Sequence, residues 1–183
     1  SLLLHSCCAP CSSYTIEYLS DYFKISVLYY NPNISPREEY EKRKAEQIRL
    51  IESMPVKNDV NFADCDYDCN EFFKIAKGYE DCREGGERCF RCYEQRLRRT
   101  AQEAQKGGYD YFCTTLSISP LKNAQKVNEI GERLSEEYCV LWLPSDFKKR
   151  EGYKRSIELS KEYNLYRQNF CGCVYSRREA ENE

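Results

Sequence analysis

The chain has 183 residues, a formal net charge of −2, and twelve cysteines beside a single histidine. A chain of this length buries a core without disulfides and contains no apolar run long enough to cross a membrane, so we expect neither a disulfide-stapled secreted miniprotein nor a membrane protein. The small net charge excludes a chain drawn to nucleic acid by its overall field, and we expect a cytoplasmic protein whose reduced cysteines bind metal or carry out redox chemistry.

Short apolar runs alternate with segments whose apolar residues recur at helical spacing, which predicts alternating strands and helices. Ser12 is expected to cap the first helix, Pro36 to open the second, and Gly107-Gly108 to close a later one. In chain order we first expect a strand at 2–6, a helix from Ser12 to about Phe23, a strand at 25–30, a helix from Pro36 to about Ser53 and a weaker strand at 56–60. An irregular insertion at about 61–88, with a short helix at 70–77, is expected next. A helix from about Arg88 to Lys106, a strand at 109–114, a helix at 123–137, a strand at 139–143 and a helix at about 149–163 complete the prediction.

This alternation favours a single α/β domain over residues 1–183, built on an open, mainly parallel five-stranded sheet with helices on both faces, of the Rossmann-like (HUP) type. Ligands bind at the carboxyl ends of the strands in such sheets. Unusual segments follow four of the expected strands, at 7–11, 31–35, 115–120 and 144–146. We therefore expect a metal site at the rim formed by those strand ends.

Seven cysteines form three tight groups that lie far apart in the sequence. They are Cys7-Cys8-Ala-Pro-Cys11, Cys89-Phe-Arg-Cys92 and Cys171-Gly-Cys173. The first two groups stand at expected helix starts, where unpaired N–H groups and the helix dipole stabilise thiolates as metal ligands. Their spacing fits a four-cysteine zinc site and an iron–sulfur cluster about equally well.

The third group, Cys171-Gly-Cys173, has a single residue between its sulfurs, so a disulfide there would close a small, strained and easily reduced ring. A redox-active pair and ligands to a second metal are its two functional interpretations, and a flexible tail with inert cysteines is the alternative. The cysteine group is expected to form a C-terminal segment after the last helix.

The other cysteines and the histidine are expected to be incidental to the chemistry. Cys113 and Cys139 fall in expected strands and are predicted to be small core residues. Cys65, Cys69 and Cys82 lie in a polar loop without a compelling metal spacing, and His5 is predicted to be a buried or turn histidine. Two basic clusters, near 96–99 and 148–155, are candidates for contacts with phosphates, although a solvated helix face explains either cluster alone.

Five motifs together closely resemble the cobalamin-independent epoxyqueuosine reductase family, and the resemblance covers nearly the whole chain. The motifs are Leu-Leu-Leu-His-Ser-Cys-Cys-Ala-Pro-Cys at 2–11, Tyr-Tyr-Asn-Pro-Asn-Ile-Ser-Pro-Arg-Glu-Glu-Tyr at 29–40, Gly-Glu-Arg-Cys-Phe-Arg-Cys-Tyr-Glu-Gln-Arg-Leu at 86–97, Thr-Thr-Leu-Ser-Ile-Ser-Pro at 114–120 and Tyr-Arg-Gln-Asn-Phe-Cys-Gly-Cys-Val-Tyr-Ser at 166–176.

The resemblance implies two-electron removal of the epoxide oxygen from epoxyqueuosine at the tRNA wobble position, giving queuosine. The implied partners are the tRNA anticodon loop and an electron donor. The implied cofactors are a 4Fe–4S cluster and an adjacent mononuclear metal, iron or zinc. By motif position, the resemblance implies that Cys7, Cys8, Cys89 and Cys92 bind the cluster. It implies that Cys171 and Cys173 form a redox-active pair, which can form a disulfide, and that Cys11 and Asp68 bind the second metal.

Two other functions are compatible with parts of the pattern. A tRNA-modifying ATP pyrophosphatase would share the alternating fold, but it needs a Gly-rich phosphate cradle where this chain has Cys-Cys-Ala-Pro-Cys. A non-catalytic RNA-binding module stapled by zinc would use the same cysteines, and it would be colourless where an iron–sulfur protein is brown.

Overall fold

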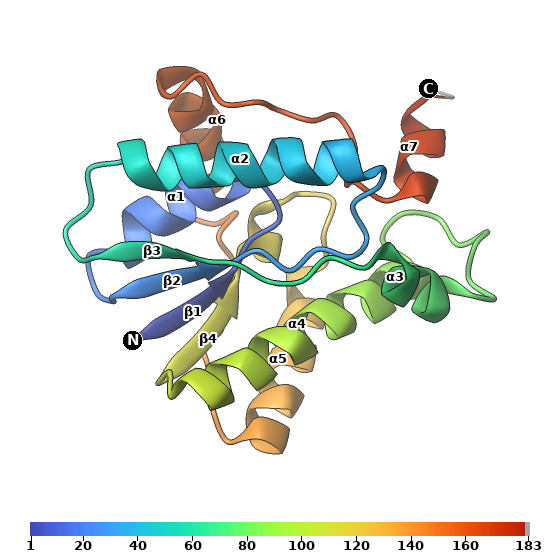
Figure 1. Cartoon of the computed structure of the whole chain (residues 1–183), viewed down its shortest axis with the longest axis horizontal. Helices are drawn as coiled ribbons and strands as arrows, with labels where there is room; N and C mark the ends of the chain where they lie inside the picture. Colours follow the sequence, from blue (N-terminus) through green and yellow to red (C-terminus); the bar gives the residue numbers. More distant parts are fainter. Residues whose placement is uncertain (182–183) are drawn as a thin grey trace.

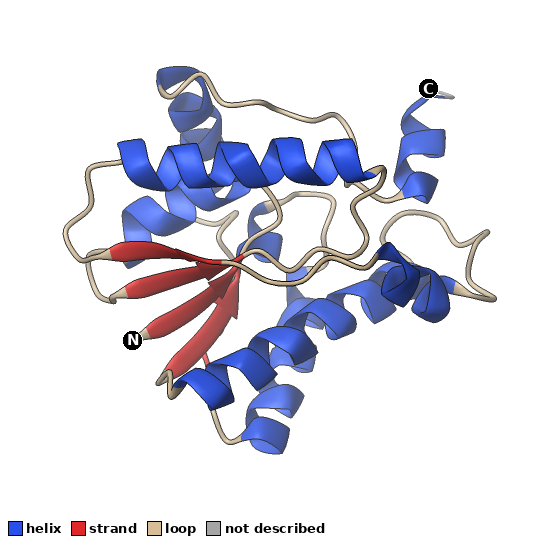
Figure 2. Ribbon diagram, viewed as in Figure 1, coloured by secondary structure: helices blue, strands red, loops and turns tan. Residues whose placement is uncertain are grey.

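The structure is a computed structural model that describes residues 1–181. Five parallel strands form one open sheet in the order β3-β2-β1-β4-β5, with helices on both faces (Figure 2). The strands are β1 (Leu2–His5), β2 (Ile25–Leu28), β3 (Val60–Ala63), β4 (Tyr111–Thr114) and β5 (Leu141–Trp142). The helices are α1 (Ala9–Leu19), α2 (Arg37–Ser53), α3 (Cys69–Ala76), α4 (Glu87–Gly107), α5 (Ala124–Tyr138), α6 (Gly152–Glu162) and α7 (Val174–Glu181), with a 3-10 helix η1 (Thr115–Ile118). The expected fold class is confirmed.

The central strand β1 is buried on both sides and separates two hydrophobic cores. Side chains alternate along a strand, so Leu3 enters one core while Leu2 and Leu4 enter the other. The core containing Leu3 lies under α4 and α5, and the second core lies under α1 and α2 (Figure 1). Because all strands are parallel, the segments after β1, β2, β4 and β5 emerge at the same rim, beside α3 and α7.

Several boundaries differ from the sequence-based prediction, and two of these differences have identifiable reasons. The weaker strand expected at 56–60 lies at Val60–Ala63, because its pairing with β2 places Phe62 beside Val27. The expected cap Ser12 is wrong. The helix α1 begins earlier, with Cys8 at the N-cap and Pro10 in the first turn, and the Ser12 hydroxyl donates instead to Gln47 Oε1 at 2.8 Å. Cys11 therefore lies inside the helix.

The chain after α6 is ordered by contacts with α2. We call residues 164–173 the C-terminal strap, which runs from α6 across to α7 in Figure 1. The Tyr166 backbone N–H donates to Glu46 Oε1 at 2.7 Å, and Arg43 Nη1 donates to the Cys171 carbonyl at 3.0 Å. A helix, α7, follows the strap where the sequence predicted only a segment. The flexible-tail interpretation of Cys171-Gly-Cys173 is therefore wrong.

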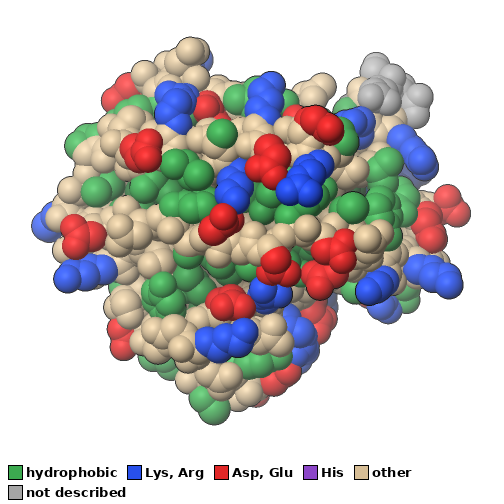
Figure 3. Space-filling view, in the orientation of Figure 1, with side chains coloured by type: hydrophobic (Ala, Val, Ile, Leu, Met, Phe, Trp, Pro, Cys, Tyr) green, Lys and Arg blue, Asp and Glu red, His purple; other side chains and the backbone are tan. Residues whose placement is uncertain are grey.

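The surface carries charges of both signs without a dominant patch on the face drawn in Figure 3, where lysines and arginines alternate with acidic side chains. Within residues 1–181, no helix combines the length and the apolar character that a membrane span requires.

Helix α6 approaches α1 so closely that only glycine fits at position 152. A Cβ there would lie 2.1 Å from the Phe147 carbonyl oxygen and 2.3 Å from the Tyr14 ring. We expect Gly152→Ala to lower the free energy of unfolding by about 1–3 kcal/mol, because a backbone oxygen has little freedom to move away. Urea denaturation measures this change. Lys161→Ala, at an exposed position of the same helix, is the control and should stay within about 0.5 kcal/mol of the parent. Equal stability of the two variants would contradict the steric argument.

Candidate functional site

The first cysteine group, Cys7, Cys8 and Cys11, follows β1 at the carboxyl rim of the sheet. The three Sγ atoms lie within 4.8 Å of one another, and those of Cys7 and Cys8 are 3.9 Å apart. The group is compact because Cys8 caps α1 in extended conformation while Cys11 stands in the first turn of that helix. Thiolates bound to one zinc ion at Zn–S distances of about 2.3 Å would have sulfurs about 3.8 Å apart, which is close to this spacing.

The second cysteine group contains Cys89 and Cys92, from the first turns of α4, and Cys171 and Cys173, from the end of the strap. All four residues line one small buried pocket. The sequence places them some eighty residues apart, and the fold brings them together because α7 and the strap pack beside the start of α4. Asn33 and Arg96 line the same pocket.

An open cleft with a volume of about 580 Å³ links the two groups. Cys7 and Cys11 of the first group and Cys171 of the second line it together with Lys122. Residues 118–121 after β4, the start of α6, the strap and one side of α7 form most of the remaining wall. The cleft therefore opens at the carboxyl rim, where ligands bind in open parallel sheets.

Four buried cations surround the two groups: Arg43, Arg88, Arg96 and Lys122. Two of them hold the backbone in place. Arg43 pairs with Glu39 at 2.7 Å besides binding the strap, and Arg88 donates to the Glu80 carbonyl at 2.7 Å and to the Cys82 carbonyl. The other two, Lys122 and Arg96, lie beside cysteine sulfur atoms.

Lys122 and Arg96 place positive charge between the cysteine groups. Lys122 is 8% exposed, and its Nζ lies 3.3 Å from Cys171 Sγ. Burial acts to lower the pKa of Lys122, but interaction with Cys171 and other anionic neighbours holds this pKa well above its ordinary value. Arg96 is fully buried and interacts electrostatically with Cys92 and Cys171 from one group and with Cys7 from the other.

The thiols differ in their tendency to ionise. Hydrogen bonds from Cys11 and Cys8, with the charges of Arg96 and Lys122, hold the pKa of Cys7 well below its ordinary value although burial acts the other way. Burial raises the pKa of Cys92 to about 12, with Arg96 opposing the rise. Burial also raises the pKa values of Cys89 and Cys173. Without a bound metal, Cys7 is therefore the sulfur best prepared to act as a thiolate.

The Cys171-Gly172-Cys173 segment is held in a conformation that only glycine allows. Gly172 has φ +120°, and a Cβ there would lie 2.9 Å from Ile34 Cγ1. Its carbonyl accepts from the Ser35 backbone N–H at 2.9 Å. The twelve cysteines, all within residues 1–181, are free thiols in the structure. The Cys171–Cys173 disulfide stays a prediction.

The sulfur donors and the buried cations fit a thiolate-bound metal or iron–sulfur group. Unpaired buried positive charge is costly, and Arg96 Nη1 and Nη2 have no hydrogen-bond partner among the described residues. An anionic, sulfur-rich group held by these cysteines would supply both the missing acceptors and the missing negative charge. A neutral core of inert cysteines would supply neither.

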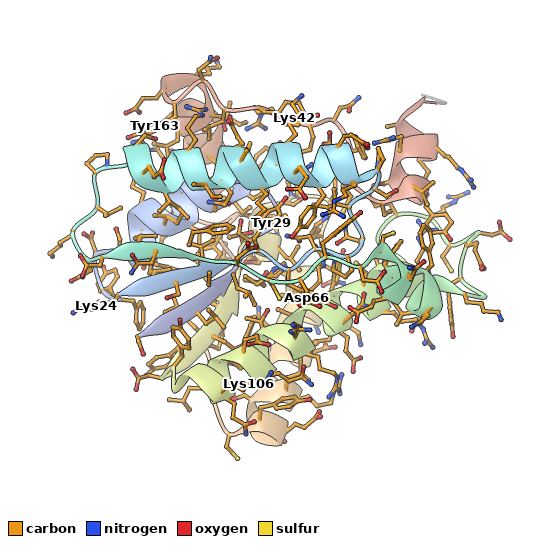
Figure 4. The ribbon with its side chains drawn as sticks, in the orientation of Figure 1. Lys24, Tyr29, Lys42, Asp66, Lys106 and Tyr163 are labelled. Carbon is orange, nitrogen blue, oxygen red and sulfur yellow. The ribbon has the colours of Figure 1, made fainter. Side chains whose placement is uncertain are left out.

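Asp68 is not brought into either cysteine group. It caps α3, where Oδ1 accepts from the Asn70 backbone N–H at 2.9 Å, and it lines neither the pocket nor the cleft. Its assignment to a second metal stays a prediction. Figure 4 shows the neighbouring Asp66 on the segment between β3 and α3, where it pairs with Arg99 of α4.

The predictions for Cys113, Cys139 and the basic cluster at 96–99 are confirmed in one case and wrong in the others. Cys113 is a buried core residue, as predicted. The same prediction for Cys139 is wrong, because this residue is exposed in a left-handed conformation at the end of α5. The phosphate-binding role of the cluster at 96–99 is wrong for Arg96, which is buried, and Arg98 and Arg99 are paired with acidic side chains.

His5 is buried, as predicted, and both of its ring nitrogens are engaged. Nε2 lies 3.1 Å from the Tyr30 carbonyl, which can only accept, so Nε2 carries the proton. Nδ1 then accepts from the Thr114 hydroxyl at 2.9 Å, and Thr114 Oγ1 itself accepts from the Leu116 backbone N–H. This neutral histidine orders the rim and has no nitrogen left for a metal.

Sequence reasoning missed the buried polar residues Asn33, Arg96 and Lys122. Asn33 stands in the Asn-Pro-Asn-Ile-Ser-Pro segment, which was expected at the rim but without a role for any single side chain. Arg96 and Lys122 belong to residue types that are seldom fully buried, so a single sequence assigns them to the surface. Arg96 lies in the family motif at 86–97 and Asn33 in the one at 29–40, so these motifs could have marked both residues for the site.

The engaged histidine makes stability depend on pH. Burial, with the Arg96 charge, lowers the pKa of His5 from 6.5 to about 4 in the folded chain. Because the unfolded chain binds the proton more readily, the contribution of His5 is fully present above pH 6.5 and is lost as the pH falls towards 4. We expect the free energy of unfolding to fall by about 2 kcal/mol more between pH 7 and pH 5 in the parent than in His5→Gln. Urea titrations at both pH values measure this difference, and parallel losses in the two proteins would contradict it.

Known proteins resemble the chain in sequence and in fold. A family model described as epoxyqueuosine reductase QueH matches residues 2–179. A protein of that name from Streptococcus pyogenes serotype M1 is 46% identical over 178 residues, covering 96% of this chain and 70% of the relative. One from Thermotoga maritima is 39% identical over 189 residues, covering 100% of this chain and 95% of the relative.

Among solved structures, a predicted subunit of tRNA methyltransferase from Methanocaldococcus jannaschii gives a TM-score of 0.53 at 14% identity, over 88% of this chain and 75% of that chain. At that identity the likeness concerns the fold alone. The sequence relatives carry the assignment, because the family match spans the whole rim on which the cysteine groups lie. The chain belongs to the epoxyqueuosine reductase QueH family.

Proposed function

We propose that this chain reduces the epoxide of epoxyqueuosine at the wobble position of tRNA. The reaction takes two electrons and two protons, breaks both C–O bonds of the epoxide, and leaves an alkene and water. Family membership supports the reaction, and the sulfur-lined cleft supports its location. The cleft, which Cys7, Cys11 and Cys171 share with Lys122, is the observation that carries the proposal. We place the reaction in the cytoplasm, where thiols stay reduced.

The cysteines divide into ligands and a redox pair in this proposal. Cys7, Cys8, Cys89 and Cys92 would hold a 4Fe–4S cluster, and Cys11 would help to hold an adjacent iron or zinc ion. When bound, the cluster supplies single electrons, and the second metal polarises an epoxide oxygen as a Lewis acid. The compact first group supports ligation by Cys7 and Cys8, and the position of Cys11 within 4.8 Å of both supports a neighbouring metal.

The Cys171/Cys173 pair is proposed to be redox-active. Cys171 faces the cleft, whereas Cys173 is buried, and Ser176 at the start of α7 places its backbone N–H 3.4 Å from Cys173 Sγ. A pair with one accessible and one shielded sulfur suits transfer of electrons from an external donor, whose identity is open. Lys122 keeps a positive charge at the accessible sulfur.

The substrate would enter with its modified base turned out of the anticodon stack. The cleft volume of about 580 Å³ lies within the usual range for a small-molecule site, about 300–1,000 Å³. Tyr153 on α6 lines this cleft and is 38% exposed, so its ring is available to stack on a base. A zinc-stapled RNA-binding module remains the alternative function, and the compact first group would also suit zinc.

The metal content separates the two functions. We expect protein purified without oxygen to be brown and to contain iron and sulfide, and we expect Cys89→Ala to lose most of both together with the turnover of epoxyqueuosine-bearing tRNA. Loss of one of the four proposed ligands leaves one iron without its thiolate and weakens retention of the cluster. Iron and sulfide analysis and a single-turnover assay measure the outcome.

Cys139→Ala is the matched control, because this cysteine is exposed and lies at the far end of α5 from the cleft. It should retain iron, sulfide and turnover. Colourless wild-type protein with bound zinc would favour the binding module, and equal turnover by Cys89→Ala and the parent would remove Cys89 from the mechanism.

Substrate stacking gives a separate prediction. We expect Tyr153→Ala to raise KM for the tRNA substrate about tenfold while kcat stays within a factor of two or so, since stacking on one base contributes about 1–3 kcal/mol. Tyr22→Ala, which removes a 66% exposed tyrosine beyond the end of α1, should leave KM unchanged. Steady-state kinetics measure both, and an unchanged KM in Tyr153→Ala would place the base elsewhere.

A further inference from the structure

Arg96 is buried without hydrogen-bond acceptors for most of its guanidinium. Its exposure is 0%, its Nε donates to the Cys92 carbonyl at 3.3 Å, and Nη1 and Nη2 have no partner among the described residues. Guanidinium is always charged in proteins and carries five donors. A group of this kind is retained in a core only where acceptors and negative charge are supplied.

Asn33, which lines the same pocket, is also buried without hydrogen-bond partners for its side chain in the described part of the chain. It is 1% exposed, and neither Nδ2 nor Oδ1 has a partner among the described residues. It comes from the segment that joins β2 to α2, whereas Arg96 comes from α4. Both residues nevertheless line the pocket that contains Cys89, Cys92, Cys171 and Cys173. Two unrelated elements thus direct unpaired polar groups into one sulfur-lined space.

The neighbouring buried arginines show that this is not a general property of the core. Arg43 and Arg88 are each 1% exposed, yet carboxylate and carbonyl oxygens engage their guanidinium groups, and only Arg88 Nε is left without a partner among the described residues. Those two residues fix the strap and the loop before α4. Arg96 has only the one carbonyl as acceptor within residues 1–181. It interacts electrostatically with the sulfurs of Cys92, Cys171 and Cys7, and its Cζ lies 5.9 Å from the centroid of the Tyr93 ring. A single water would offer acceptors but no compensating charge.

We infer that Arg96 and Asn33 donate hydrogen bonds to the sulfur atoms of the iron–sulfur group held by the cysteines, and that the Arg96 charge stabilises the reduced state of that group. The inference rests on the proposed function, which supplies the group and the reductant. Uptake of one electron adds one negative charge and breaks no bond, so a fixed buried cation favours the reduced state. Net charge and hydrogen bonds to sulfur are known determinants of such potentials.

The test measures the midpoint potential of the group in anaerobically purified protein, by dye-mediated titration followed by absorbance and by electron paramagnetic resonance. Arg96→Met should shift the potential to more negative values. The expected change is at least tenfold in the ratio of reduced to oxidised protein at a fixed potential, which is about 59 mV for one electron. Arg96→Lys keeps the positive charge but loses the planar guanidinium donors, so it should shift the midpoint potential less. Asn33→Leu should shift it in the same direction by a smaller amount.

Arg98→Met is the matched control. It removes a positive charge from the same helix, but Arg98 is paired with Glu94 and Glu137 and lines neither the pocket nor the cleft. Its potential should equal that of the parent. Iron and sulfide are counted in every variant, so that a change in potential is separated from a loss of the group.

The possible results separate the inference from the proposed function. Wild-type protein without iron and sulfide would overturn the proposed function, and the inference with it. If the wild-type protein contains iron and sulfide but Arg96→Met and Asn33→Leu have the same midpoint potential as the wild type, the inference is overturned and the proposed function is not. If Arg96→Met fails to fold or to retain the group, Arg96→Lys and Asn33→Leu provide the test. Unchanged midpoint potentials in both variants would overturn the inference, and shifts to more negative potentials would support it.

Discussion

The site depends on positive charge buried among sulfur atoms. Arg96 and Lys122 stand between two groups of cysteines, and neither has a carboxylate partner within hydrogen-bond distance among the described residues. Charge taken out of water must be compensated nearby, so the cysteines have to supply negative charge. The two cations add to the hydrogen bonds from Cys11 and Cys8 that lower the pKa of Cys7, and they distinguish these sulfurs from the small apolar cysteines of an ordinary core.

The parallel sheet makes this arrangement available. Every strand ends at the same rim, so the loop after β1, the segment after β2 and the 3-10 helix after β4 converge without long excursions. The strap then closes the site from the outside. Arg43 holds it to α2, and the absence of a side chain at Gly172 lets it pass close to Ile34. The engaged His5 fixes the rim beneath, through Thr114 and the Tyr30 carbonyl.

Patterns with strong local causes could be predicted from the sequence. The strand and helix order, the helix start near Cys89 and the convergence at one rim follow from periodicity and from parallel pairing. The start of α1 at Ala9 was missed because Cys8, at the N-cap position, makes no side-chain capping hydrogen bond that a sequence pattern would indicate. The pairing of Phe62 with β2, rather than local propensity, set the bounds of β3. Arg98 looked like a phosphate ligand, but carboxylates on α4 and α5 neutralise it. Partners of that kind depend on tertiary structure and have no signature in one sequence.

The distribution of the sulfur atoms along the chain has a consequence for biosynthesis. Cys7 is translated before Cys89, and Cys171 and Cys173 follow in the segment directly before α7. A ribosome emits the chain from its amino end, so a nascent polypeptide exposes the first thiols long before their counterparts exist. If Cys7, Cys8, Cys89 and Cys92 hold the cluster as proposed, its insertion has to wait until the start of α4 has emerged. Until then, the early cysteines need protection from oxidation and from adventitious metals.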